Sequence, residues 1–164
     1  MILALSRLAH CAVNTVTHTL DDGSLLVFEL VDDAPNDALL AAEVDLDRGV
    51  EWLLRLDRVD FPPGGVAYRH THPGPGIRCL LFGRIRIESC GETHEYGPFE
   101  PWFESGPQAV FAAASETEPT AFVRAMLVPR EWEGRRTIRY VDPADEDKPK
   151  LQRATVFLER PVEH

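Results

Sequence analysis

The chain has 164 residues, a formal net charge of −10, 44% hydrophobic residues and 27% charged residues. This length and balance are typical of a single globular domain that buries its own hydrophobic core. The acidic excess argues against nucleic acid or an anionic membrane as a partner, because both attract basic surfaces.

The first fifty residues mix strand and helix signals. Residues 2–12 fit either a short helix or an N-terminal strand. Residues 13–20 and 25–30 are β-favouring runs on either side of an Asp-Gly turn, which predicts a hairpin. Residues 38–43 follow an Asx cap and Pro35, and they favour one or two helical turns.

From residue 50 onward the pattern predicts a succession of short strands separated by Pro and Gly turns. So many short strands at this spacing indicate an antiparallel β-sandwich or barrel. No internal repeat or composition shift marks a second domain. Edge strands at both ends are expected to extend the sheets or to meet a second subunit. The expected strands cover residues 50–61, 66–72, 77–82, 84–89, 93–96, 102–105, 109–114, 121–128, 137–141 and 150–158.

Two histidines stand out on the expected strand at 66–72. His70 and His72 are two residues apart, and alternate residues of a strand project from the same face. Two imidazoles presented in this way can share one divalent metal ion. A bare pair of this kind is also typical of two packed histidines on an ordinary strand, so the spacing alone leaves both interpretations open.

The cysteines and the N-terminal segment give no sign of secretion. Three cysteines, Cys11, Cys79 and Cys90, form no CxxC pair, so we expect neither a disulfide framework nor a structural zinc site. The first ten residues are apolar but are interrupted by Arg7 and lack the order of a signal peptide. No apolar run approaches the length of a membrane span. We therefore expect a cytoplasmic protein that does not bind membranes.

Two stretches of the chain resemble the cupin superfamily. Residues 60–83 resemble its first conserved motif, in which a glycine-led strand carries HxH and the next strand ends in glycine. Residues 96–107 resemble the start of its second motif. The resemblance implies an all-β fold, a cupin-type jelly-roll barrel or sandwich of antiparallel strands with few short helices. It also implies one cupin domain over residues 1–164, with the core barrel at about 50–128 and the site in the barrel mouth. The matching positions are Gly65, His70, His72, Gly83, Gly97 and Gly106.

The match departs from the usual cupin metal site at two ligands. The resemblance places a glutamate at Gly76 or Ile77 and a last histidine near Ala109 or Val110, and none of these side chains binds a metal. Two of the four usual ligands are therefore absent from the sequence.

One group of relatives also lacks the glutamate. Three-histidine cupin dioxygenases share the HxHxGPG pattern of residues 70–76 and carry an acidic residue where Glu104 stands, although they keep the last histidine. The resemblance thus implies a divalent metal ion (Fe, Zn, Ni or Mn) held by His70, His72 and Glu104, since two histidines and a carboxylate form many non-haem iron sites. Glu104 and Tyr68 are the candidate catalytic residues, Glu104 as a ligand or general base and Tyr68 as a hydrogen-bond donor. The alternative for Glu104 is a solvated glutamate on a strand.

Strand alternation assigns four further residues. Trp102 shares a face with Glu104 and lines the same pocket if Glu104 points inward. We expect Cys79 in the core as a small hydrophobic residue. We expect His94 on the surface, with a third nitrogen ligand as the less favoured alternative. Arg78 is expected on the surface or at an interface, with an anion-binding role as the less favoured alternative.

We expect a metal-dependent cupin enzyme that acts on a small organic molecule, such as a dioxygenase, in a homodimer. The alternative is a cupin that has lost catalysis and binds a small ligand, or that serves as a structural dimer without metal. A sugar-phosphate isomerase or epimerase is less favoured, because no evident cluster of Lys and Arg on the expected pocket strands is placed to hold a phosphate.

Overall fold

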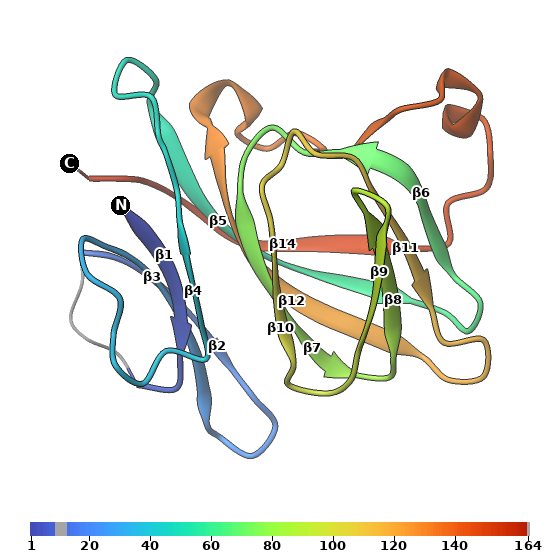
Figure 1. Ribbon diagram of the computed structural model, residues 1–164, viewed down its shortest axis with the longest axis horizontal. Helices are drawn as coiled ribbons and strands as arrows, with labels where there is room; N and C mark the ends of the chain where they lie inside the picture. The colour runs from blue at the N-terminus through green and yellow to red at the C-terminus, as the bar shows by residue number, and fades with distance from the viewer. Residues whose placement is uncertain (9–12, 164) are drawn as a thin grey trace.

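The computed structural model describes residues 1–8 and 13–163, which form three antiparallel sheets and two short 3-10 turns (Figure 1). Within this described part, no helix is long and apolar enough to cross a membrane. The strands are β1 (Ile2–Ser6), β2 (Asn14–Thr19), β3 (Leu25–Val31), β4 (Leu40–Glu43), β5 (Trp52–Phe61), β6 (Val66–Thr71), β7 (Gly76–Phe82), β8 (Ile85–Ser89), β9 (Glu92–Tyr96), β10 (Pro101–Glu104), β11 (Val110–Ala114), β12 (Thr120–Pro129), β13 (Arg139–Tyr140) and β14 (Arg153–Pro161), and the turns are η1 (Arg130–Trp132) and η2 (Pro143–Glu146).

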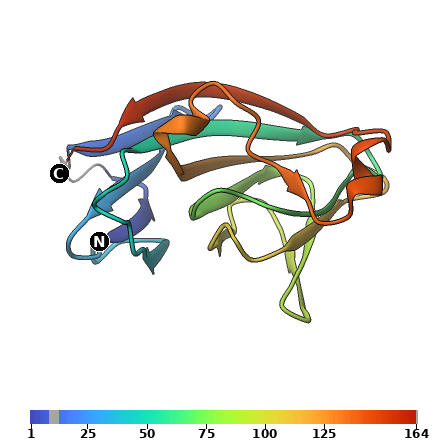
Figure 2. The same ribbon diagram turned by 90° about the horizontal axis from the view of Figure 1, so that it is seen from above.

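The strands from β5 to β12 form a jelly roll. One sheet has the order β10-β7-β12-β5 and the other β6-β11-β8-β9, and β14 and β13 extend them next to β5 and β6. The chain passes repeatedly from one sheet to the other, with one hairpin at β8–β9, which gives the two Greek keys of a jelly roll. In Figure 2 the two sheets lie over one another. The predicted all-β jelly-roll fold with extra terminal strands is confirmed.

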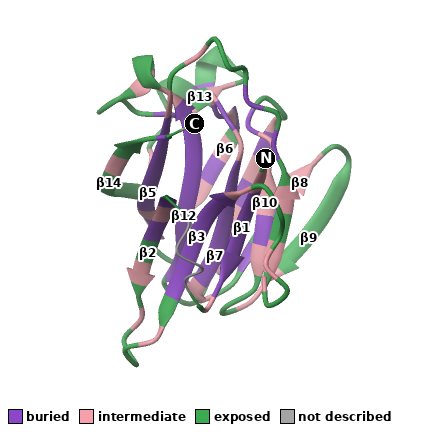
Figure 3. Ribbon diagram, turned by 90° about the vertical axis from the view of Figure 1, so that its left-hand side faces the viewer, coloured by how far each residue is buried: buried purple, intermediate pink, exposed green. Residues whose placement is uncertain are grey.

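The N-terminal strands form a separate sheet with the order β2-β3-β1-β4. Its apolar face packs against the outer face of the β5–β12–β7 sheet, in a cluster that includes Leu5, Phe28, Leu54, Ile77 and Leu127. Strands β7 and β12 are therefore covered on both faces, and Figure 3 shows them buried along most of their length. Burial on both faces explains why these strands have almost continuous apolar sequences.

The N-terminal predictions had mixed outcomes. The hairpin at 13–30 is confirmed, and β2 pairs with β3 around Gly23, whose φ is +82°. Residues 2–6 form β1, which decides the open choice between helix and strand there; residues 9–12, with Cys11, lie outside the described residues. The helical turns predicted at 38–43 are wrong. Residues 40–43 form β4, because pairing with the edge of β1 satisfies their backbone groups and outweighs a weak helical preference.

The two described cysteines are free thiols. Cys79 is fully buried in the core, as predicted, and Cys90 is exposed in the β8–β9 turn. Burial raises the pKa of the Cys79 thiol to about 11, so this side chain behaves as a small apolar group.

Candidate functional site

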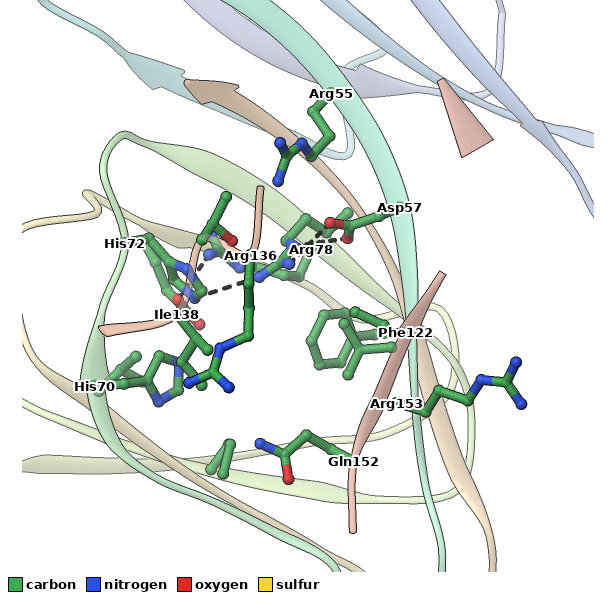
Figure 4. Close-up of a pocket in the computed structure, with 18 of the residues that line it drawn as sticks. Arg55, Asp57, His70, His72, Arg78, Phe122, Arg136, Ile138, Gln152 and Arg153 are labelled. Carbon is green, nitrogen blue, oxygen red and sulfur yellow. Dashed lines mark hydrogen bonds and ion pairs between the residues drawn. The ribbon is translucent and has the colours of Figure 1, made fainter. Parts of the chain in front are cut away.

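A cavity of about 450 Å³ lies between the two sheets of the jelly roll. Strands of both sheets form its walls, and some residues of the segment 134–156 line it as well (Figure 4). Seven of the chain's 17 Lys and Arg residues line the cavity, but only two of its 27 Asp and Glu residues do. A protein with a net charge of −10 therefore gathers basic residues around one cavity, although the guanidinium of one of them, Arg153, points away from it (Figure 4). The basic residues are Arg55, Arg78, Arg124, Arg135, Arg136, Lys150 and Arg153, and the acidic residues are Asp57 and Glu104.

His70 lines the cavity from β6 and is 5% exposed. Its Nδ1 lies 2.6 Å from the carbonyl oxygen of Tyr68. A carbonyl oxygen only accepts hydrogen bonds, so Nδ1 donates and the neutral ring carries its lone pair on Nε2. Burial lowers the pKa of His70, and this effect exceeds the opposing influence of the Glu104 carboxylate.

His72 lies directly after β6, with its ring centroid 4.8 Å from that of His70. Its Nε2 is 3.3 Å from Nη1 of Arg124. A guanidinium only donates, so Nε2 accepts this bond and the proton of the neutral ring is on Nδ1, which is buried without a hydrogen-bond partner among the described residues. Burial, followed by the charges of Arg124 and Arg78, lowers the pKa of His72 well below its ordinary value. Both imidazoles are therefore neutral at pH 7.

A buried ion pair holds Arg124 in this position. Arg124 on β12 pairs directly with Asp57 on β5 across the sheet, and the two residues are 6% and 1% exposed. Nε and Nη2 of Arg124 donate to the two carboxylate oxygens of Asp57 at 2.8 and 2.9 Å. Burial opposes the charge on Arg124, but the charge and hydrogen bonds of Asp57, together with the Glu104 carboxylate, outweigh burial and raise the pKa of Arg124. The bidentate contact leaves Nη1 directed to His72.

A second buried arginine holds Glu104. Nη2 of Arg78 lies 2.8 Å from Oε2 of Glu104, and Nη1 donates to the carbonyl oxygen of Gly76 at 2.6 Å. The contact with Glu104 is an ion pair but not an aligned hydrogen bond, so Nη2 has no hydrogen-bond partner among the described residues. Trp102 donates from Nε1 to Oε1 of Glu104 at 2.8 Å. Burial lowers the pKa of Arg78 to about 10, which still leaves it charged at pH 7.

The prediction that Arg78 lies on the surface or at an interface is wrong, because it is 1% exposed. Strand β7 alternates as expected, with Ile77 and Cys79 on one face and Arg78 on the other. The N-terminal sheet covers the Ile77 face, so the face of Arg78 is the interior of the barrel. The two-residue period of β7 is correct, but the period does not show which face of the strand lies inside the barrel.

The remaining predicted site residues are divided between the cavity and its surroundings. Glu104 and Trp102 both line the cavity, as their shared face implied. Tyr68 is half-buried and contributes its carbonyl oxygen to His70, but the described lining residues do not include it. The ring of Tyr140 on β13 takes the place next to His70, with centroids 6.4 Å apart. His94 is exposed on β9 next to Glu92, as predicted.

The residues present do not fit a divalent metal ion. In the part of the chain that the structure describes, no three His, Cys, Asp or Glu side chains are grouped to hold one. Glu104 is bound by Arg78, and the lone pair of His72 Nε2 accepts from Arg124. A glutamate cannot replace Gly76 without movement, because an added Cβ would lie 2.7 Å from the carbonyl oxygen of Ala125.

Sequence reasoning missed the residues that complete the site, chiefly Arg124 and Asp57. Arg124 is the only charged residue in the apolar run at 121–128, and buried charges in such runs require partners. That pattern was the available signal. In Figure 4 Arg136 and Gln152 extend into the cavity near His70, whereas Arg153 points away from it. Arg136 and Gln152 come from the C-terminal segment, and no pattern in the sequence indicates that this segment lies against the barrel.

The strand order and the histidine-bearing β6 define the class: the chain has a cupin-type jelly-roll fold. No protein-family model and no curated protein matches the chain. Among solved structures it is similar to KdgF from Halomonas sp., with 21% identity over 53% of this chain and 84% of that one and a TM-score of 0.40. It is similar to an RmlC-like cupin from Shewanella frigidimarina, with 16% identity over 53% and 83% of the two chains and a TM-score of 0.40. It is also similar to an oxalate oxidase, with 16% identity over 79% and 78% and a TM-score of 0.40.

Proposed function

We propose that this cupin-fold protein binds a small organic anion in the jelly-roll cavity. The observation that carries the proposal is the excess of basic side chains around a cavity in an otherwise acidic protein. A cleft with charges of one sign and low-dielectric walls focuses the field and raises the local concentration of ligands of opposite charge. A cavity of about 450 Å³ also suits a small organic molecule.

Basic groups in two regions of the cavity would bind different parts of such a ligand. Nη2 of Arg78 forms an ion pair with Glu104 but has no hydrogen-bond partner among the described residues, and Arg78 lines the cavity. Arg136, which is largely exposed, and Lys150 also line the cavity, so they offer a second cationic region. Between them, Phe122 and Trp102 provide apolar walls for the body of the ligand. A carboxylate or phosphate next to Arg78 would receive charge-assisted hydrogen bonds.

The sequence disfavoured phosphorylated ligands because it showed no basic cluster on the expected pocket strands. The positions of the arginines remove that reason. Arg78 and Arg124 are such a cluster, on β7 and β12. Carboxylates and phosphates are therefore both included in the test.

The test is a thermal-shift and calorimetric screen of small mono- and dicarboxylates and of inorganic phosphate. Arg136→Gln removes a cation of the cavity lining without disturbing the core, because this side chain is 56% exposed. Loss of one charge-assisted hydrogen bond, about 1.5–3 kcal/mol, would weaken binding roughly 10- to 100-fold. The matched control is Arg86→Gln, an exposed arginine on β8 outside the cavity lining, which should bind like the wild type. No binding of any anion, or equal loss in both variants, would contradict the proposal.

The competing function is the metal-dependent dioxygenase predicted from the sequence, with a metal on His70, His72 and Glu104. Anion binding by guanidinium groups needs no metal, whereas substrate binding through a metal does. The same titration after exhaustive dialysis against a chelator separates the two. Unchanged affinity supports the arginine site, and affinity that returns only with added Fe, Zn, Ni or Mn supports the metal site.

A further inference from the structure

We infer that Arg124 takes the place of a divalent metal ion in this barrel, as a permanent cation that the fold itself supplies. This inference concerns the cation of the site and does not require the proposed anion ligand to be correct. It rests on the geometry of Arg124, Asp57, His70 and His72.

The guanidinium occupies the position that a metal on His72 would need. A histidine binds a metal through the lone pair of a ring nitrogen. Nη1 of Arg124 is 3.3 Å from His72 Nε2 and donates to that lone pair. His72 therefore offers no free nitrogen lone pair, because its Nδ1 carries the proton of the neutral ring.

The guanidinium is fixed in place and cannot readily withdraw. Two bonds of 2.8 and 2.9 Å bind it to Asp57, and both side chains are almost fully buried. Turning away would leave the Asp57 carboxylate buried without its charge partner, which is strongly unfavourable. A metal would also have to approach within a few ångströms of a fixed positive charge in a low-dielectric interior, where repulsion is strong.

Two imidazoles and a carboxylate surround the guanidinium. His70 donates from Nδ1 to the carbonyl oxygen of Tyr68, and this second-shell contact is typical of metal-binding histidines because it presents the Nε2 lone pair. The His70 and His72 rings lie 4.8 Å apart. Without Arg124, the Asp57 carboxylate would lose both of its hydrogen-bond donors and could bind a cation instead. We therefore expect that one substitution at position 124 converts the arginine site into a metal site.

The experiment compares cobalt binding by untagged wild type, Arg124→His and Arg124→Ala. In Arg124→His the new imidazole adds a third nitrogen and Asp57 becomes its second-shell partner. In Arg124→Ala, Asp57 itself joins the two histidines. Visible absorption of bound Co²⁺ and elemental analysis after gel filtration report binding, and circular dichroism confirms folding of each variant. We expect substoichiometric cobalt in the wild type and about one ion per chain in both variants.

Two further variants test whether the ion binds where expected. Adding His72→Gln to Arg124→His should abolish the cobalt spectrum, whereas adding His94→Gln, on the exposed β9 strand, should leave it unchanged. Adding Asp57→Asn to Arg124→His should weaken cobalt binding roughly 10- to 100-fold. The inference is overturned if the wild type binds one ion per chain through His72, or if neither folded variant at position 124 gains cobalt. These outcomes leave the anion titrations unaffected, so the two proposals fail separately.

Discussion

Replacing Arg124 by methionine tests how far the buried ion pair determines the stability of the barrel. Methionine fills much of the same volume but removes the positive charge, so the Asp57 carboxylate loses both of its guanidinium hydrogen bonds. Asp57 is 1% exposed, which means that water cannot replace the lost partner without a structural change.

The expected cost follows from the burial of the pair. Removing one member of a buried ion pair destabilises a protein by about 3–5 kcal/mol, because an uncompensated charge remains inside. For a chain of this length, 1 kcal/mol lowers the melting temperature by roughly 2–4 °C, so Arg124→Met should melt roughly 6–20 °C below the wild type. Replacing the whole pair by apolar residues is often neutral, and the double variant Asp57→Leu/Arg124→Met should recover much of the loss.

Urea unfolding of the wild type, both single variants and the double variant measures the coupling directly. The free energies of unfolding form a double-mutant cycle, and its interaction term isolates the pair. The reasoning fails if Arg124→Met costs less than about 1 kcal/mol, as an exposed ion pair would. It also fails if the two single losses simply add in the double variant.

Three further predictions follow from other buried groups. Buried Arg55 binds Glu159 and the carbonyl oxygens of residues 132 and 135. Arg55→Met should therefore lower the free energy of unfolding by about 2–4 kcal/mol. It should also speed amide hydrogen exchange in residues 130–136 more than in β12. Burial lowers the pKa of His72, so near pH 6.5 the unfolded chain binds a proton that the folded chain does not bind. The free energy of unfolding should therefore fall as the pH drops below this value. Urea unfolding at pH 5 and 7.5 should show a smaller fall for His72→Gln than for the wild type. In a Cys11→Ser background, Cys90 should react with a thiol reagent at pH 8 within minutes while Cys79 reacts only on unfolding, and equal rates would contradict the burial of Cys79.

The homodimer predicted from the sequence stays a prediction, and the structure indicates where it can be tested. The edge strand β14 exposes a row of apolar side chains, Val156, Phe157 and Leu158, each more than 40% accessible. An exposed apolar edge strand is a ready surface for pairing with another chain. Light scattering of the wild type and of Phe157→Lys would show whether this edge is used.

Local chemistry in the sequence determined most of the fold. The strands from β5 to β12 lie where alternation and the Pro and Gly turns predicted them, because turn residues and apolar alternation are properties of short segments. The pair at His70 and His72 and the shared face of Glu104 and Trp102 followed from the same two-residue period, and all four side chains line the cavity. The helical turns at 38–43 failed for the opposite reason, since pairing with β1 is a contact between distant segments.

What the site can do was decided by tertiary structure. Which face of β7 is inside depends on the N-terminal sheet that covers the other face, and this alone placed Arg78 in the cavity. The partners of His72 and Glu104 come from β12 and β7, so one of the two histidines that suggested a metal site in the sequence accepts a hydrogen bond from an arginine in the fold. Two-residue spacing shows which side chains share a face. The register between strands decides which charges meet there, and here it brings a guanidinium to an imidazole lone pair.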